Sequence, residues 1–282
     1  MRAETANGDG GGAARRIAGV LGELLITCGL IVLLFVAWEL WWTNLEADRK
    51  QDAATSALVR QFGDVPLPER PSARPPAGTA GPEAPSSAGP QAPAAADPGA
   101  SSKADREEFG APPAARLDLD GATFAVMYIP RFGEDFARPV TNGVGLDVLN
   151  NLGIGHYPST QLPGEKGNFA VAAHRQTHGQ VFYDIDKLGA GDRIYVQTRE
   201  GFYTYAYRST EIVHPTRSEV LLPVPHRPGA EPTTSILTLT SCDPPFSTAM
   251  RIIAYAELES WRPASSGPPA DIANAVAHTL AG

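Results

Sequence analysis

The hydrophobic residues of this chain form one long block near the N-terminus and several short runs after residue 120. The long block, Ile17 to Trp42, carries only the charges of Glu23 and Glu39 and is uncharged from residue 24 to 38. An apolar helix of this length spans a hydrocarbon core of about 30 Å. The pattern therefore predicts a transmembrane helix over residues 17–42.

The flanks of this block indicate its orientation. Arg15 and Arg16 precede it directly, and positive residues favour the cytoplasmic side, so residues 1–16 are expected to be a cytoplasmic tail. The tryptophans at its other end would lie at the outer interface. A cleaved signal peptide would need small residues at a cleavage site, whereas the flank here is the bulky "WELWWTNLE". We expect an uncleaved signal anchor in the cell membrane, with the remainder of the chain outside.

Residues 43–115 contain few side chains that could fill a core. The first part, 43–62, is polar and free of Pro and Gly, which predicts a short exposed helix. Residues 64–113 are rich in Pro, Ala, Gly and Ser, a composition typical of a disordered or semi-extended spacer. In a polyproline-like conformation this spacer would reach on the order of 150 Å. We interpret 43–115 as a stalk that lets a folded domain work at a distance from its anchor.

Residues 116–262 hold the short apolar runs, which turn residues separate. Six runs rich in Val, Ile, Tyr, Phe and Thr predict strands: Thr123–Pro130, Asn168–His174, Arg193–Thr198, Phe202–Val213, Ser235–Cys242 and Arg251–Trp261. Short helices are expected at Val144–Leu152 and Val181–Leu188. The predicted fold is mainly β, an antiparallel sheet closed into a barrel or sandwich. Residues 263–282 are expected to be a C-terminal tail, with a weak helix at 271–280.

Composition argues against several classes of function. The net charge of −8 argues against a nucleic-acid partner, because phosphate contacts need a basic face. No His, Cys, Asp and Glu cluster has the spacing of metal ligands, and no glycine-rich phosphate loop occurs. We therefore expect no metal and no cofactor.

The chain has two cysteines, and Cys28 lies in the membrane block. Cys242 is thus the single thiol of the predicted domain, which is unusual for an exported protein. A free Cys is often a small core residue, but "SCDPP" ends a strand, and strand ends are where functional residues gather. A cysteine nucleophile also needs a proton donor and donors for an oxyanion.

Six histidines are candidates for the proton donor: His156, His174, His178, His214, His226 and His278. His174 ends an apolar strand, so it is the leading candidate, although the pattern does not decide. Arg251 begins the strand that follows Cys242. If these two strands form a hairpin, the Arg would favour a thiolate and bind a carbonyl or oxyanion. The alternative is an Arg that is simply solvated at a strand start.

"AVAAHR" and "LTLTSC", with an Arg nine residues after the Cys, resemble the sortase family of cysteine transpeptidases. Residues 153–175 are similar to the segment that leads to the family's histidine, and the resemblance covers nearly all of 123–258. It implies a sortase-like closed β-barrel with a few short helices. Cys242 matches the nucleophile, His174 the acid that protonates the leaving amine, and Arg251 the residue that orients the substrate carbonyl and stabilises the oxyanion. Ala173 and Ser241 replace the Gly and Thr that are commoner in the family.

The resemblance also implies an activity. Sortases cleave a Thr–Gly bond in the C-terminal sorting signal of a surface protein, hold the protein as a thioester and pass it to an amine of a peptidoglycan precursor. The anchor, the Pro-rich stalk and "MYIPRFG" look like the class E housekeeping sortases of high-GC Gram-positive bacteria. Those prefer a Leu-Ala-x-Thr-Gly signal over Leu-Pro-x-Thr-Gly. A pilus-assembling sortase is the alternative, because the Pro-rich stalk could hide a lid motif.

The connection "VLLPVP", residues 220–225, stands where the family has its substrate-binding loop. Its apolar residues, Leu222 and Val224 among them, either contact the leucine of the signal or cap the core. Further candidate substrate contacts are Tyr128, Tyr157 and Thr240.

Two functions outside the sortase family are alternatives. An L,D-transpeptidase places His, Gly, Cys and Arg almost consecutively, which "TSCDPP" does not match. A non-catalytic anchored β-domain would hold Cys242 as a buried, inert structural residue.

Overall fold

The computed structural model describes residues 10–63, 66–67, 98–117 and 122–281. Its helices are α1 (Gly10–Gln61), α2 (Pro98–Phe109), α3 (Leu146–Asn151) and α4 (Ala273–Ala281). Its strands are β1 (Thr123–Tyr128), β2 (Ala137–Asn142), β3 (Ile154–His156), β4 (Gly167–Ala172), β5 (Arg193–Gln197), β6 (Gly201–Val213), β7 (Ser235–Asp243) and β8 (Met250–Pro263).

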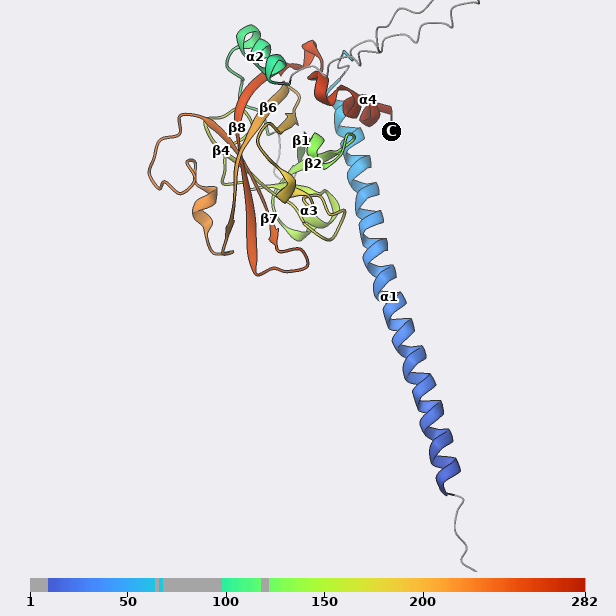
Figure 1. Ribbon diagram of the computed structural model, residues 1–282. Coiled ribbons are helices and arrows are strands. Elements are labelled where there is room, and N and C mark those ends of the chain that lie inside the picture. Colours follow the sequence, from blue (N-terminus) through green and yellow to red (C-terminus); the bar gives the residue numbers. More distant parts are fainter. Residues whose placement is uncertain (1–9, 64–65, 68–97, 118–121, 282) are drawn as a thin grey trace, which may run out of the picture.

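The strands close into a barrel in the order β1-β2-β3-β4-β7-β8-β6-β5 (Figure 1). β2 pairs with β3 and β4 with β7 in parallel, and the other six neighbouring pairs are antiparallel. The prediction of a mainly antiparallel closed barrel is therefore confirmed. The six predicted strands are present, but β2 and β3 were not predicted. β2 contains Arg138 and Pro139, and β3 has only three residues, so neither carries the apolar pattern of a strand.

The apolar run at β1 reflects a strand that is covered on both faces. Met127 and Ile129 belong to the core inside the barrel, whereas Val126 and Tyr128 belong to a second core outside the barrel wall. Successive side chains of a strand point to opposite faces, so a strand buried on both faces needs apolar residues at every position.

The second core joins α1 and α4 to the outside of the barrel. Leu58 and Val59 of α1 pack there with Ile272 and Val276 from the C-terminal segment. The prediction of an exposed helix over 43–62 is therefore wrong, because α1 continues unbroken from the apolar block and buries one side on the barrel. Three of its polar residues, Gln51, Thr55 and Ser56, are buried on that side, and the Thr55 hydroxyl donates to the carbonyl of Gln51 at 2.7 Å.

Other segments outside 116–262 also pack on the barrel. α2 lies along β8, where Arg106 donates to the Glu259 carbonyl at 2.6 Å and Arg262 pairs with Asp105 at 2.9 Å. This part of the expected spacer is thus a folded helix, and residues 68–97 lie outside the described residues. The weak helix expected in the C-terminal tail is present as α4. Of the two short helices, α3 is confirmed, whereas residues 181–188 contain only a 3-10 turn at Ile185–Lys187.

The N-terminal part of α1 projects away from the barrel (Figure 1). Within the described residues it is the one helix long and apolar enough to cross a membrane, with a mean hydropathy of 2.6 over its most apolar 18 residues and none of them buried. This agrees with a single membrane anchor. Because α1 itself joins this segment to the barrel, the expectation that a long spacer separates the two is wrong.

Candidate active site

Cys242 and Arg251 lie opposite each other in the β7–β8 hairpin, as predicted. Directly opposed residues of an antiparallel pair have Cβ atoms about 5 Å apart on one face of the sheet. Cys242 is a half-buried free thiol. The Nη1 of Arg251 donates to the carbonyls of Thr248 at 3.1 Å and Met250 at 2.9 Å, which holds its guanidinium on the hairpin.

His174 lies on the other side of Cys242, just after the end of β4. β4 runs parallel to β7, and their last paired residues are Ala172 and Thr240. His174 and Cys242 each follow their strand's last paired residue by two positions, and residues two apart share one face of a strand. Because β7 lies between β4 and β8, Cys242 is flanked by His174 on one side and Arg251 on the other.

Ala173 and Ser241, which replace the Gly and Thr that are commoner in the family, contact each other next to this site. The Ser241 hydroxyl donates to the carbonyl of Ala173 at 2.8 Å, and the Ala173 N–H donates to the carbonyl of Thr240 at 3.3 Å. These bonds continue the pairing of β4 and β7 up to His174 and Cys242, so both substitutions fit the geometry of the site.

His174 is half-buried between two neighbours. Its Nε2 lies 2.7 Å from the Oδ1 of Asn150, and its ring centroid lies 5.1 Å from that of His178. Burial lowers the pKa of His174, and the nearby charge of His178 lowers it further. The neutral imidazole is therefore the favoured form near neutral pH. Sequence reasoning missed Asn150, since an Asn in a short helix carries no signal of this contact.

Arg175 and Asp243 follow His174 and Cys242 by one residue and form an ion pair. The Arg175 side chain is only 3% exposed, and it also pairs with Asp186 at 3.0 Å. The pair links the ends of β4 and β7 beneath the candidate catalytic residues. The local sequence gives no sign of this role of Arg175, because its partners come from other parts of the chain.

The other histidines occupy different places. His178 packs on His174, and His156 is 1% exposed between the rings of Phe124 and Phe169, where burial lowers its pKa to about 4. The remaining three are His214 in the turn after β6, His226 on the outer side of the barrel against Glu211, and His278 on α4. His174 is therefore the histidine that the strand register brings beside Cys242.

Two of the residues expected to contact substrate, Tyr157 and Thr240, contact each other. The hydroxyls of Tyr157 and Thr240 are 3.1 Å apart, and Thr240 lies on the same face of β7 as Cys242. Tyr128 does not fit a substrate contact. Its side chain is fully buried under α1 and α4, and its hydroxyl donates to Gln197 at 2.7 Å.

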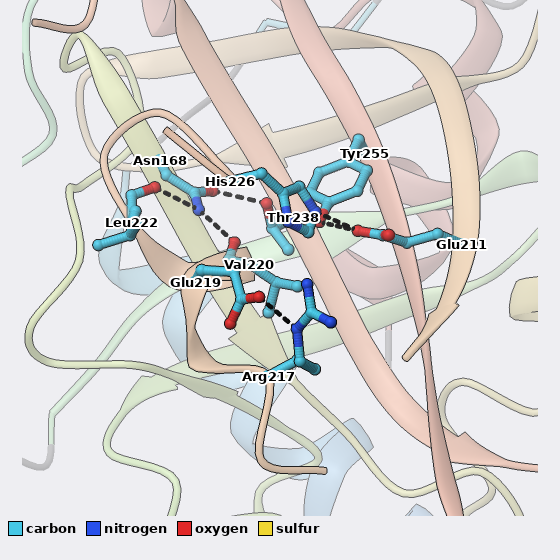
Figure 2. Close-up of polar contacts among 9 residues, drawn as sticks. All are labelled: Asn168, Glu211, Arg217, Glu219, Val220, Leu222, His226, Thr238 and Tyr255. Atoms are coloured by element: carbon cyan, nitrogen blue, oxygen red, sulfur yellow. Dashed lines mark hydrogen bonds and ion pairs between the residues drawn. The ribbon is translucent and has the colours of Figure 1, made fainter. Parts of the chain in front are cut away.

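The connection between β6 and β7 is fastened to the barrel by Asn168 (Figure 2). The buried amide of Asn168 donates to the carbonyls of Val220 at 2.9 Å and Leu222 at 3.1 Å, and its Oδ1 accepts a bond from Thr238 at 2.6 Å. Leu222 and Val224 are half-buried on this connection. Their side chains therefore belong to a segment whose backbone is held from inside the barrel wall.

On the outer side of the same connection, the Oε1 of Glu211 lies 2.6 Å from both the His226 Nε2 and the Tyr255 hydroxyl (Figure 2). This cluster fastens the far end of the connection to β6 and β8. In the described part of the chain, no group of three or more His, Cys, Asp or Glu side chains could hold a metal ion.

Comparison with known proteins agrees with this arrangement. A model of the sortase domain family matches residues 127–259. Sortase SrtE2 from Streptomyces coelicolor (strain ATCC BAA-471 / A3(2) / M145) is 31% identical over 257 residues, which cover 88% of this chain and 84% of that protein. The chain belongs to the sortase family.

Sortase SrtE1 from the same strain is 30% identical over 265 residues, 92% of this chain, and the chain spans 62% of that protein's length. The SrtA sortase from Actinomyces oris is 37% identical in structural alignment, with a TM-score of 0.55 over 58% of this chain and 94% of that one. Sortase E from Streptomyces avermitilis is 41% identical, with a TM-score of 0.50 over 55% and 99%. The predicted likeness to class E sortases is therefore confirmed.

Proposed function

We propose that this chain is a membrane-anchored sortase that cleaves the Thr–Gly bond of a C-terminal sorting signal through a thioester and transfers the released protein to an amine. The observation that carries the proposal is Cys242, flanked on the two neighbouring strands by His174 and Arg251. This acyl transfer needs a nucleophile, a proton donor and an oxyanion donor close together, and these three residues lie at one end of the barrel.

In this reaction the thiolate Sγ of Cys242 attacks the carbonyl carbon of the substrate threonine, and Arg251 binds the oxygen on which negative charge develops. The C–N bond then breaks, His174 gives its proton to the leaving glycine amine, and a thioester remains. An acceptor amine attacks the thioester carbon, its proton passes to His174, and Sγ leaves as the thiolate. The enzyme ends with the same protons as it began.

The lowered pKa of His174 bears on the acid step. It makes the protonated ring a stronger acid toward the leaving amine, while leaving fewer molecules protonated at neutral pH. The first step needs the thiolate of Cys242 and the protonated ring of His174 at the same time.

The substrate side of the proposal rests on the residues around Cys242. Tyr157 and Thr240 would contact the signal next to the scissile bond, and Leu222 and Val224 would contact its leucine. Crystallised Sortase E1 from Streptomyces coelicolor, 34% identical in structural alignment, holds a tripeptide in its active site.

The location follows from α1. Arg15 and Arg16 would stay in the cytoplasm, and the barrel would lie outside the cell membrane. Its partners there would be surface proteins with a Leu-Ala-x-Thr-Gly or Leu-Pro-x-Thr-Gly signal and the amine of a peptidoglycan precursor. In Figure 1 the β7–β8 hairpin points to the same side as the apolar part of α1, so the site would face substrates that are themselves held at the membrane.

The test uses the full chain in nanodiscs, with quenched peptides that carry either signal and with an amine acceptor. The chain offers a matched control, because Cys28→Ala removes the other thiol and Cys242→Ala the nucleophile. We expect the wild type and Cys28→Ala to cleave and transfer, and Cys242→Ala to do neither. Intact mass spectrometry should show an acyl adduct on the active proteins only.

Activity that survives in Cys242→Ala would sink the proposal. A folded wild type that cleaves neither peptide, and whose Cys242 resists alkylation, would instead indicate a non-catalytic β-domain. Transfer that requires a lysine side chain of another surface protein would indicate a pilus-assembling enzyme.

A further inference from the structure

The loop after His174, residues 176–180, has a backbone that its own residues do not favour. His178 has φ +52 and Gln180 has φ +51, both in the left-handed region, with Gly179 between them at φ +88. A non-glycine residue in this region is disfavoured by roughly 1–2 kcal/mol. Such a conformation persists only where its surroundings determine it.

Two side chains of α1 provide these surroundings. The Nε2 of Gln51 donates to the carbonyl of His178 at 3.1 Å, and the N–H of Gly179 donates to the Oδ1 of Asn44 at 3.1 Å. Positions 44 and 51 are seven residues apart, about two helical turns, and therefore lie on one face of α1. The carbonyl and the N–H of neighbouring loop residues are thus both bonded to that face.

The contact at Gln51 is closely fitted. Its side chain is completely buried, although a glutamine is usually exposed. A Cβ added at Gly179 would lie 3.0 Å from the Nε2 of Gln51, and one added at Gly153 would lie 3.1 Å from its Cδ. Two loops that need glycine for their positive φ therefore close around this one side chain.

α1 also reaches the other neighbour of His174. Lys50 donates to the Oδ1 of Asn151 at 3.1 Å, and the adjacent residue Asn150 bonds the His174 ring. The two groups that border the His174 ring, His178 and Asn150, therefore both belong to segments that α1 contacts.

We propose that the segment of α1 next to the membrane, residues 43–51, is a positioning element of the active site. Asn44 and Gln51 hold the His178 loop against His174, and this contact sets the orientation of the catalytic ring and keeps it partly dry. The inference rests on the proposed function for the role of His174, but the contact itself does not. The apolar block and the residues that hold the His178 loop then lie on the same helix, because Asn44 follows the last tryptophan of the block by two residues.

The variants must leave the charges around the loop unchanged. The titratable groups that face it are His178 itself and, from α1, Glu46, Asp48 and Lys50. Asn44→Ala and Gln51→Met alter none of them, and methionine nearly keeps the volume of the buried glutamine while removing its donor. Asp52→Asn is the matched control, because it removes the charge of an ion pair between α1 and Arg138 on β2 and leaves the contacts with the loop unchanged.

The experiment uses the full chain in nanodiscs with selectively labelled histidine, and follows the His174 pKa by NMR together with kcat and KM for the signal peptide. In the double variant Asn44→Ala/Gln51→Met we expect the His174 pKa to rise toward its ordinary value, because the ring becomes more exposed to water. We expect kcat to fall between 10- and 100-fold with KM little changed, as for a misplaced catalytic group. Asp52→Asn should leave the His174 pKa, kcat and KM at their wild-type values.

An unchanged His174 pKa and kcat in the double variant would overturn the inference, as would equal losses in Asp52→Asn. The two proposals fail separately. A wild type without transpeptidase activity would refute the proposed function, whereas the pKa of His174 in the variants would still decide whether α1 positions its ring.

Discussion

His156 is a neutral ring inside the barrel, and its replacement by glutamine is expected to change how folding depends on pH. The side chain is 1% exposed, with its Nδ1 2.9 Å from the Oδ1 of Asn142 and its Nε2 3.1 Å from the carbonyl of Gln161. Burial lowers its pKa from 6.5 to about 4. Glutamine retains an amide that can reach the Gln161 carbonyl but does not titrate.

The magnitude follows from the two pKa values. Below pH 6.5 the unfolded chain binds a proton on His156 that the folded chain does not bind until about pH 4. The free energy of unfolding therefore keeps the whole contribution of His156 above pH 6.5 and loses it as the pH falls toward 4. At about 1.4 kcal/mol for each pH unit, the loss across this window is about 3 kcal/mol.

The assay is urea unfolding of the full chain in mild detergent, followed by near-UV circular dichroism between pH 4.5 and 7.5. His156→Gln should be less stable than the wild type at pH 7.5 but should lose about 2–3 kcal/mol less on acidification. His214→Gln, at an exposed turn, is the control and should keep the slope of the wild type. A free energy of unfolding that falls as steeply with decreasing pH in His156→Gln as in the wild type would refute this prediction.

Three further changes test other parts of the site. Asn168→Ala removes both bonds to the β6–β7 connection, so KM for the signal peptide should rise about tenfold with a smaller change in kcat, as measured by steady-state cleavage. Arg175→Met leaves the carboxylate of Asp243 without its partner and should lower the free energy of unfolding by about 3–5 kcal/mol in urea titrations, whereas Arg175→Lys should lower it less. Arg251→Lys keeps the charge but loses the planar fork, so kcat/KM should fall about 100-fold while the melting temperature stays within a few degrees; an unchanged kcat/KM would remove Arg251 from the oxyanion role.

Much of the barrel could be predicted from local pattern. Six strands show as runs of β-branched and aromatic residues between turns, and the β7–β8 hairpin follows from two such runs joined by "DPPFSTAM". A hairpin brings residues that are close in sequence into register, so the pairing of Cys242 with Arg251 needs no knowledge of the rest of the fold. β2 and β3 could not be predicted in this way, because β2 contains Arg138 and Pro139 and β3 has only three residues, so neither carries an apolar pattern of its own.

The position of His174 beside Cys242 is a less local result. It depends on the parallel pairing of β4 with β7, which are separated by two other strands in the chain. The pattern of residues alone left six histidines as candidates, and the resemblance to sortases selected one of them. The register of β4 and β7 now provides a physical reason for the same choice.

The sequence by itself determined the apolar N-terminal block, most of the strands and the residue types of the candidate active site, because each depends on neighbours along the chain. Only the tertiary structure decided which surfaces are covered. Tyr128 belongs to an apolar strand, and its side chain on the outer side of the barrel is buried because α1 and α4 dock there. Gln51 is a polar helix residue that is buried because two glycine-bearing loops close on it. A side chain's own chemistry sets what it can bond, whereas its burial depends on which distant segments fold against it, and local sequence does not record that.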